Sequence, residues 1–92
     1  MLLGLIEKTP DEVLNYDTDM ARWLGDGDAL VGVAAAITGS TAVVDSAEVS
    51  TSAIKVVLSG GADGDAGQLT LLATTNLGLV KEVCYRLRVK DC

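Results

Sequence analysis

Apolar and polar residues alternate most clearly near the end of the chain. In the closing segment "VKEVCYRLRVKD" the apolar residues take every second position: Val83, Tyr85, Leu87 and Val89. Successive side chains of a strand point to opposite faces, so this period of two predicts a strand with one buried face.

The preceding segment predicts a partner for this strand. "QLTLLATT" places Leu69, Leu71 and Ala73 on one face. The "NLG" at 76–78 is typical of a tight turn, so the two segments are expected to form a hairpin.

Further short strands are predicted upstream. "AIKVVLSGG" alternates its apolar residues and stops at Gly60-Gly61, and "STAVVDSAEVS" supplies one or two more strands. In "ALVGVAAAITGS" three consecutive alanines suit a helix, but alternation from Val31 to Ile37 favours a strand. Six or seven short strands with Gly-rich turns predict a single all-β domain, an antiparallel immunoglobulin-like β-sandwich of about seven strands.

The segment "TPDEVLNYDTDMARWL" at 9–24 fits two structures. Thr9 to Glu12 reads as a capping box, and Val13, Tyr16, Met20 and Trp23 have helical spacing. Residues 15–19 are weak helix formers, however, and the apolar positions from Leu14 to Met20 also alternate. Periodicity leaves strand and helix both open here.

Composition narrows the function. The 92 residues allow one small domain, and their 49% hydrophobic content is ample for its core. The net charge of −6 repels phosphate backbones, so we expect no nucleic-acid partner. The charge is unevenly distributed, because residues 1–28 carry a net charge of −5 and residues 80–92 carry +2. Opposite charges at the two ends permit a head-to-tail contact between copies, but they are also typical of an ordinary solvated surface.

Candidate chemistry is sparse. The chain has no His, which leaves Cys84 and Cys92 without a base or a zinc-binding partner, so no catalytic, cofactor or metal site is predicted. On one strand the two thiols are too far apart to bond, which fits a reducing compartment. The Asp-Gly-Asp triplets at 26–28 and 63–65 resemble fragments of calcium loops, but turn chemistry also explains them.

Neither a signal peptide nor a membrane partner is expected. "MLLGLI" is too short for a signal-peptide core, and no run approaches the twenty apolar residues of a membrane span. The "MLLGLI" segment is also too apolar to remain exposed to water, so we expect a partner to order it. Residues 1–10 are therefore predicted to form an extended N-terminal arm, and residues 11–92 to form the sandwich.

Two further groups of residues are candidate contacts. Tyr16, Met20, Trp23 and Leu24 form either a docking cluster or one end of the core, because Trp and Tyr dominate binding hot spots. One face of the last predicted strand carries Arg86, Arg88 and Lys90. These basic residues either bind a partner or prevent a further strand from pairing with this one. With the arm, the predicted interface residues are Leu2, Leu3, Leu5, Ile6, Tyr16, Met20, Trp23, Leu24, Arg86, Arg88 and Lys90.

Three segments resemble one known family. "KTPDEVLNYDTDMARWLGDGD", "VVLSGG" at 56–61 and "VKEVCYRLRVKD" are together similar to the small fiber-tail adaptor proteins of tailed bacteriophages. Members typically read Pro-x-Glu-x-Leu-Asp-Tyr, Asp-Trp-x-x-Trp-Leu-Gly-Asp, Leu-Ser-Gly-Gly and a last strand ending Arg-x-Arg. The chain departs from this pattern at Asn15 and at Met20, where the family favours Asp and Trp.

The resemblance implies a structural role in a virion. It implies an extended segment from Leu14 to Met20, followed by a short helical turn at 21–24. It also implies partners among the tail tube or nozzle and the fibre, copies of the chain in a ring, and assembly in the bacterial cytoplasm. A head-to-tail joining or tail-completion protein would need only similar surfaces, and a glycan- or calcium-binding module is an alternative from another class.

Overall fold

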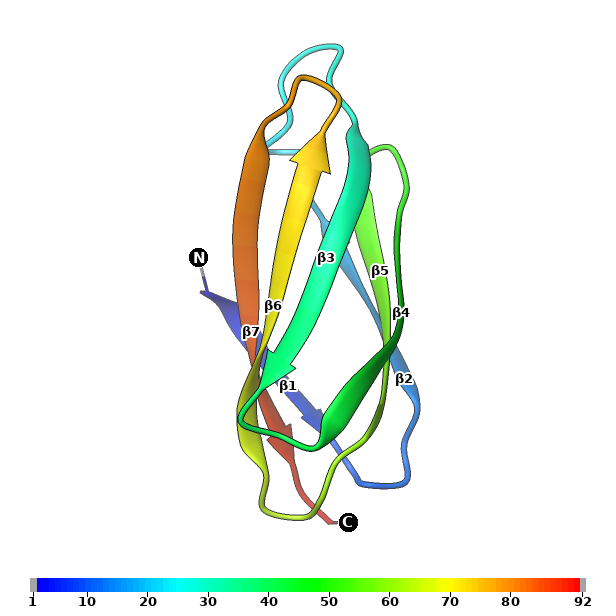
Figure 1. Ribbon diagram of the computed structural model, residues 1–92, viewed down its shortest axis with the longest axis vertical. Coiled ribbons are helices and arrows are strands. Elements are labelled where there is room, and N and C mark those ends of the chain that lie inside the picture. The colour runs from blue at the N-terminus through cyan, green and yellow to red at the C-terminus, as the bar shows by residue number, and fades with distance from the viewer. Residues whose placement is uncertain (1, 92) are drawn as a thin grey trace.

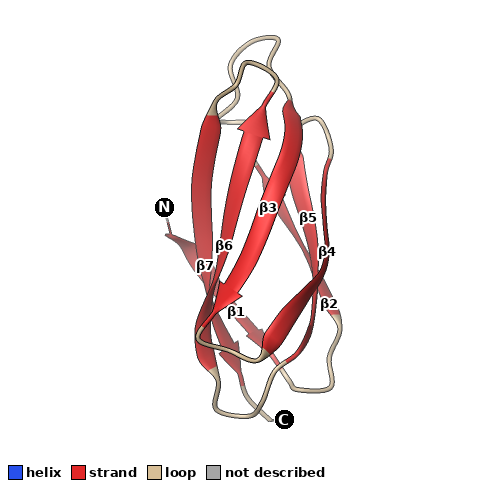
Figure 2. Cartoon of the chain, viewed as in Figure 1, coloured by secondary structure: helices blue, strands red, loops and turns tan. Residues whose placement is uncertain are grey.

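Seven strands in two sheets make up the fold of the computed structural model, which describes residues 2–91 (Figures 1 and 2). In chain order the strands are β1 (Leu2–Lys8), β2 (Leu14–Asp19), β3 (Leu30–Thr38), β4 (Ala42–Val49), β5 (Ala53–Gly60), β6 (Ala66–Thr75) and β7 (Val80–Val89). The described residues contain no helix, so the predicted all-β class is confirmed.

The strands form two facing layers. One sheet has the order β1-β7-β6-β3 and the other β2-β5-β4. In Figure 1 the first sheet lies in front and the second behind it. The molecule is elongated along the strands, with extents of 43 × 20 × 16 Å.

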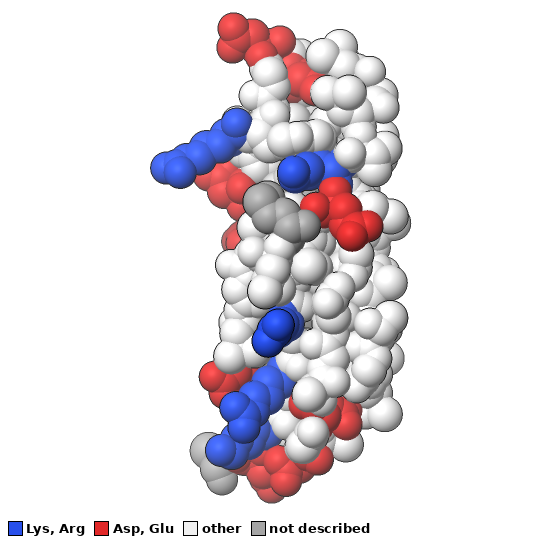
Figure 3. Space-filling model, turned by 90° about the vertical axis from the view of Figure 1, so that its left-hand side faces the viewer, with Lys and Arg blue, Asp and Glu red and all other residues white. Residues whose placement is uncertain are grey.

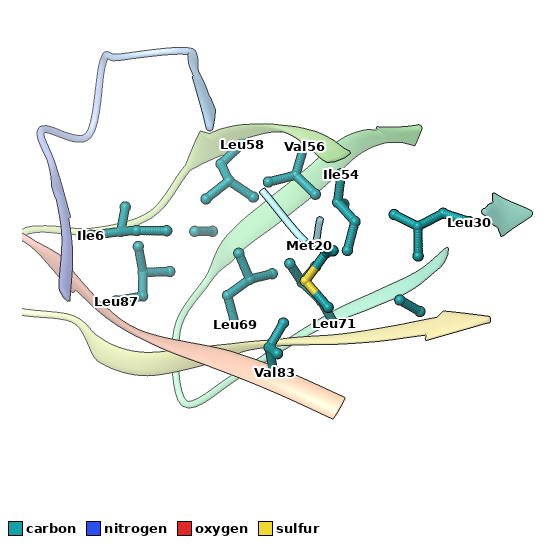
Figure 4. Close-up of a cluster of buried hydrophobic side chains, with 12 residues drawn as sticks. Ile6, Met20, Leu30, Ile54, Val56, Leu58, Leu69, Leu71, Val83 and Leu87 are labelled. Atoms are coloured by element: carbon teal, nitrogen blue, oxygen red, sulfur yellow. The ribbon is translucent and has the colours of Figure 1, made fainter. Parts of the chain in front are cut away.

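The core lies between the two layers. Its side chains come from the alternate positions that the sequence predicted, namely Ile54, Val56 and Leu58 of β5, Leu69, Leu71 and Ala73 of β6, and Val83, Leu87 and Val89 of β7. Figure 4 shows the three β5 residues facing Leu69, Leu71, Val83 and Leu87 across the interior. Each of these nine side chains is at most 1% exposed. The period of two thus identified the buried faces correctly because one face of each strand meets the other sheet.

The ambiguous segment forms a strand. β2 covers Leu14–Asp19 and pairs antiparallel with β5, and the buried Thr18 alternates with exposed Asp17 and Asp19. The capping-box contacts still form, because the Thr9 N–H donates to Glu12 Oε1 at 2.7 Å and the Glu12 N–H donates to the Thr9 carbonyl at 3.2 Å. They close a turn instead of starting a helix, since weak helix formers follow.

A single turn follows β2. The N–H groups of Trp23 and Leu24 both donate to the Met20 carbonyl, at 3.0 and 3.3 Å, before the chain continues into the loop before β3. The short helical turn that the family resemblance implied is therefore one hydrogen-bonded turn.

The expected N-terminal arm is not confirmed. Residues Leu2–Lys8 form β1 at the edge of the chain's own sheet, where β1 pairs parallel with β7, so this pair also departs from the expected antiparallel pattern. Ile6 is 2% exposed and belongs to the same core as the residues of the later strands. Among the apolar residues of this strand, the chain's own sheet buries Ile6 and leaves the leucines exposed.

Candidate protein-binding surfaces

β1 presents two different sides. Ile6 points into the core, whereas Leu2, Leu3 and Leu5 are 51%, 38% and 53% exposed. Ile6 was predicted to contact a partner, and in this structure the β1–β7 pairing buries it in the core. The three leucines lie on an exposed sheet edge, where large apolar side chains mark a contact surface.

Lys8 closes the other end of β1. Its side chain is 3% exposed, and its ammonium donates hydrogen bonds to the Thr9 carbonyl at 2.7 Å and the Gly60 carbonyl at 2.5 Å. A lysine that points inward on an edge strand hinders the addition of a further strand. Sequence reasoning gave Lys8 no role, because nothing in the sequence shows which way an edge lysine points.

The Trp23 cluster closes one part of the core. Met20 is 4% exposed, and Tyr16, Trp23 and Leu24 are half-buried and pack against the buried residues. All four predicted residues therefore belong to the core or border it, and the turn after β2 links Met20 with Trp23 and Leu24. Met20 was predicted as a residue of either a docking cluster or one end of the core, and in this structure its side chain lies in the core.

Tyr16 links β2 to β1. Its hydroxyl donates to the Glu7 carbonyl at 3.4 Å. Burial raises the pKa of the Tyr16 hydroxyl, and the negative charge of Glu12 raises it further. The hydroxyl therefore stays neutral at physiological pH and acts as a hydrogen-bond donor.

The predicted basic residues lie near one another on the β1–β7 side. Arg86 and Arg88, here called the basic pair, are exposed on β7, and exposed Lys90 follows the strand. Figure 3 shows Lys and Arg side chains gathered in the lower half of this side, with acidic side chains nearby. Glu7 is the register neighbour of Arg88 and offsets part of the positive charge.

Next to the basic pair, the outer surfaces of β3 and β6 carry no charge, whereas exposed Glu82 of β7 lies beside Leu72 in register. The exposed or half-buried outward residues of β3 and β6, here called the uncharged face, include Ala34, Ala36, Thr38, Gln68, Thr70, Leu72 and Thr74. Register places Gln68 beside Arg86 and Thr70 beside half-buried Cys84. Figure 3 shows uncharged atoms along the right-hand edge, which is this face seen from the side.

The sequence analysis overlooked the uncharged face. β3 and β6 together contain no charged residue, although 22% of the chain is charged. The absence of charge from these two strands was the feature of the sequence that could have revealed the face. Solvated strand faces ordinarily carry charged residues, whereas the centres of protein interfaces are depleted of them.

The outer surface of the second sheet has the opposite character. Its exposed charged residues, here called the acidic face, are Asp17 and Asp19 of β2, Asp45 and Glu48 of β4, and Lys55 of β5. The Ser59 hydroxyl donates to Asp45 Oδ1 at 2.9 Å, which holds that carboxylate on this face. Four carboxylates surround one ammonium, so the face is negative.

The two Asp-Gly-Asp triplets lie at opposite ends of the molecule, in the loops before β3 and before β6 (Figure 1). Asp28 Oδ1 accepts hydrogen bonds from the N–H groups of Ala29 and Leu77, at 2.9 and 3.3 Å. Asp63 Oδ1 accepts one from the Asp91 N–H at 2.8 Å. The triplets thus serve as turn and loop connectors, and residues 2–91 hold no group of three metal-binding side chains.

Asp65 has the most strongly perturbed carboxyl group. Its Oδ2 accepts hydrogen bonds from the N–H groups of Thr41 and Ala62 and from the hydroxyls of Ser40 and Thr41, at 2.9 to 3.0 Å. These donors, led by the Thr41 N–H, hold the pKa of Asp65 well below its usual range. The carboxylate therefore joins the β3–β4 turn to the loop before β6.

Cys92 and Met1 lie outside the described residues. Within residues 2–91, no helix is long and apolar enough to cross a membrane.

Comparison with known proteins identifies the family. No curated protein matches the chain. A family model described as "Podophage GP4 fiber-tail adaptor protein gp77" matches residues 8–88, which include every strand except most of β1 and the last residue of β7. This match covers most of the 92 residues and agrees with the motifs at both ends. The chain therefore belongs to the podophage fiber-tail adaptor family, whose members are structural proteins of the phage tail.

Proposed function

We propose that this chain fastens tail fibres to the phage tail through protein–protein contacts and catalyses no reaction. The family match over residues 8–88 carries the proposal. The surfaces support it, because the molecule presents an exposed leucine edge, an uncharged face and an acidic face. Among residues 2–91, the side chains with perturbed pKa values are Tyr16 and Asp65, and both make hydrogen bonds that hold loops and strands together.

The strand order supports an immunoglobulin-like sandwich. When the strands are lettered A to G in chain order, the sheets here are A-G-F-C and B-E-D. An immunoglobulin constant domain has A-B-E-D and C-F-G. The two arrangements differ only in the first strand, which here pairs with the last.

In this proposal the exposed predicted residues make the contacts. Leu2, Leu3 and Leu5 meet an apolar surface on the tail tube or nozzle, and the half-buried Trp23 and Leu24 complete a second contact with the fibre. Copies of the chain surround the tail as a ring, and the virion tail takes them up after synthesis in the bacterial cytoplasm. The arm expected over residues 1–10 then acts as β1.

Immunogold labelling of purified virions tests this function. Antibodies raised against the purified chain should label the tail at the level where the fibres attach. Label at the neck between head and tail would instead support a head-to-tail joining protein, and absence of label from disrupted particles would overturn both roles. Virions made without the chain, supplied with it again in trans, provide the matched control: fibres should be lost and then restored.

A further inference from the structure

We infer that the Asp26-Gly27 bond is a site of spontaneous covalent modification, at which aspartate of the folded chain converts to isoaspartate, and that the fold protects the Asp63-Gly64 bond of the same sequence. The conversion is a reaction of the chain with itself and with water. It is therefore separate from the proposed adaptor role, and either idea can fail without the other.

The chemistry belongs to the Asp-Gly sequence. The backbone nitrogen of the glycine attacks the carboxyl carbon of the aspartate side chain, and the amide proton leaves with the hydroxyl of the protonated carboxyl as one water molecule. A five-membered succinimide ring results. Water then adds to one of the two ring carbonyls and opens the ring to aspartate or to isoaspartate. Glycine favours the attack because it has no Cβ to obstruct the nitrogen.

Both Asp-Gly pairs lie at the centre of the same kind of turn. A hydrogen bond from the N–H of the last residue to the carbonyl of the first closes turn 25–28 at 3.1 Å and turn 62–65 at 3.0 Å. Gly27 and Gly64 have positive φ angles of 75° and 89°, as the third residue of a type II turn does. The central aspartate and glycine of each turn are exposed. A difference in reactivity must therefore come from the surroundings of the turns.

The Asp-Gly peptide group must rotate before the ring can close. In a type II turn the second residue has an extended ψ angle, which directs the following backbone nitrogen away from the side chain of that residue. The rate of ring closure thus depends on how easily each turn opens. Contacts that hold the peptide group or the carboxylate in place slow the reaction.

Hydrogen bonds to the end of β7 hold the turn at 62–65. The Gly64 N–H donates to the Val89 carbonyl at 2.9 Å, so the amide group that would attack is already bonded. The Asp63 carboxylate that would be attacked accepts a hydrogen bond from the Asp91 N–H at 2.8 Å. The Val89 N–H also donates to the Asp65 carbonyl at 3.0 Å. Rotation of this Asp-Gly peptide group would break several of these bonds at once.

The turn at 25–28 is anchored differently. Buried Asp28 holds its last position, because Asp28 Oδ1 accepts hydrogen bonds from the N–H groups of Ala29 and Leu77 at 2.9 and 3.3 Å. Within residues 2–91, no group donates to the Asp26 carboxylate and none accepts from the Gly27 N–H. In Figure 1 this loop lies at the top of the molecule, far from the end of β7. The Asp-Gly peptide group therefore rotates here while Asp28 stays in place.

The modification changes the course of the chain beside a candidate contact surface. Isoaspartate adds one methylene group to the backbone between residues 26 and 27 and leaves the α-carboxylate as the side group, with no change in mass. The turn connects the half-buried Trp23 and Leu24 to β3. Aged protein is thus a mixture of two backbones at this loop.

A comparison of folded and denatured protein provides the test. The purified chain is incubated for weeks at mildly acidic pH, since ring closure starts from the carboxylic acid, and circular dichroism verifies that it stays folded. Trypsin cuts after Arg22, Lys55 and Lys81, which separates the two Asp-Gly pairs into peptides 23–55 and 56–81. Electron-transfer fragmentation then measures the isoaspartate at each position.

The folded chain should form isoaspartate at position 26 at least tenfold faster than at position 63, because several hydrogen bonds must open before position 63 reacts. In guanidinium chloride the two positions should react at similar rates. Equal rates in the folded chain, or a faster reaction at position 63, would overturn the inference. A denatured chain that keeps the tenfold preference would also overturn it, because the preference would then come from neighbouring residues in the sequence.

Two substitutions that keep the charge give the matched controls. Asp26→Glu should abolish modification at this position, because glutamate closes a six-membered ring far more slowly. Asp63→Glu alters the exposed aspartate of the other turn and should leave the rate at Asp26 unchanged. Isoaspartate in peptide 23–55 that persists in Asp26→Glu would assign the reaction to another residue and refute the inferred site.

Discussion

Gly67 is the glycine with the least space for a side chain. A Cβ there would overlap the Thr38 carbonyl oxygen and lie 3.1 Å from the Gly39 carbonyl carbon, and both obstacles are backbone atoms. Gly67→Ala should lower the free energy of unfolding by about 1–3 kcal/mol, because the β3–β4 turn must move. The measurement is equilibrium denaturation in urea.

Gly32→Ala is the matched control for this substitution. Gly32 also lies in a strand, but nothing lies within 4 Å of the Cβ that alanine would add. Alanine there should leave stability unchanged or raise it by up to about 1 kcal/mol, through a less flexible unfolded chain. Equal losses in both variants would show that β-strand glycines matter here for a reason other than crowding.

Asp65→Asn should destabilise the chain in a pH-dependent way. The four donors to Oδ2 favour the carboxylate and lower the pKa of Asp65, so this group contributes stability above its ordinary pKa of 3.8 and loses the contribution as the pH falls below it. The gap in melting temperature between the unmodified chain and the variant should therefore be widest near neutral pH and should shrink at more acidic pH.

Asp11→Asn, an exposed carboxyl at the Thr9–Glu12 turn, controls for the loss of one negative charge. Thermal melts followed by circular dichroism at several pH values measure both variants. The prediction is wrong if the difference in melting temperature between Asp65→Asn and the unmodified chain stays constant or grows as the pH falls. In that case the Asp65 carboxylate is not what holds the β3–β4 turn.

At the scale of elements, β1 provides the sharpest test of the fold. Ile6 and Leu5 are adjacent large apolar residues, 2% and 53% exposed. Ile6→Ala should lower the free energy of unfolding by about 2–5 kcal/mol, whereas Leu5→Ala should cost less than about 1 kcal/mol. Urea denaturation of dilute protein measures both. If both substitutions change the free energy of unfolding by similar small amounts, residues 2–8 do not pack in the sheet, and the predicted N-terminal arm is the better description.

Most elements could be predicted from the sequence, and the reason is visible in particular residues. Leu69, Leu71 and Ala73 occupy every second position and are flanked by Gln68, Thr70 and Thr74, so period two revealed both the strand and its buried face although Leu72 is also apolar. β1 gave no such pattern because its apolar residues are consecutive, and an edge strand needs only Ile6 on the inside. Its parallel pairing with β7 joins the two ends of the chain, a relation that local patterns do not encode.

The candidate surfaces were predictable only in part. The exposure of Arg86 and Arg88 could be predicted because charge alternates with buried residues along β7. The burial of Met20 and Ile6 could not, because an apolar residue looks the same in sequence whether it packs inside or meets a partner. The acidic face requires β2 and β4 to lie on either side of β5, which depends on the order of strands in the sheet.

At the scale of the whole molecule, the strand order predicts how the chain folds. Only β4–β5 and β6–β7 pair consecutive strands, whereas β2–β5, β3–β6 and β1–β7 pair distant ones. Folding dominated by distant pairings occurs in milliseconds to seconds in small domains. The β1–β7 pairing closes the longest loop and so carries the largest closure entropy, which places it late in folding.

Stopped-flow fluorescence can test this order, since Trp23 is the only tryptophan and packs against the core. If β1 docks after the transition state, Ile6→Ala should leave the refolding rate within about twofold of the unmodified chain and should raise the unfolding rate by nearly the whole change in stability. Leu71→Ala, at the centre of the β3–β6–β7 sheet, should instead slow refolding. If Ile6→Ala instead slows refolding by an amount that accounts for its whole loss of stability, the two ends of the chain pair early in folding. That result would contradict the loop-closure argument.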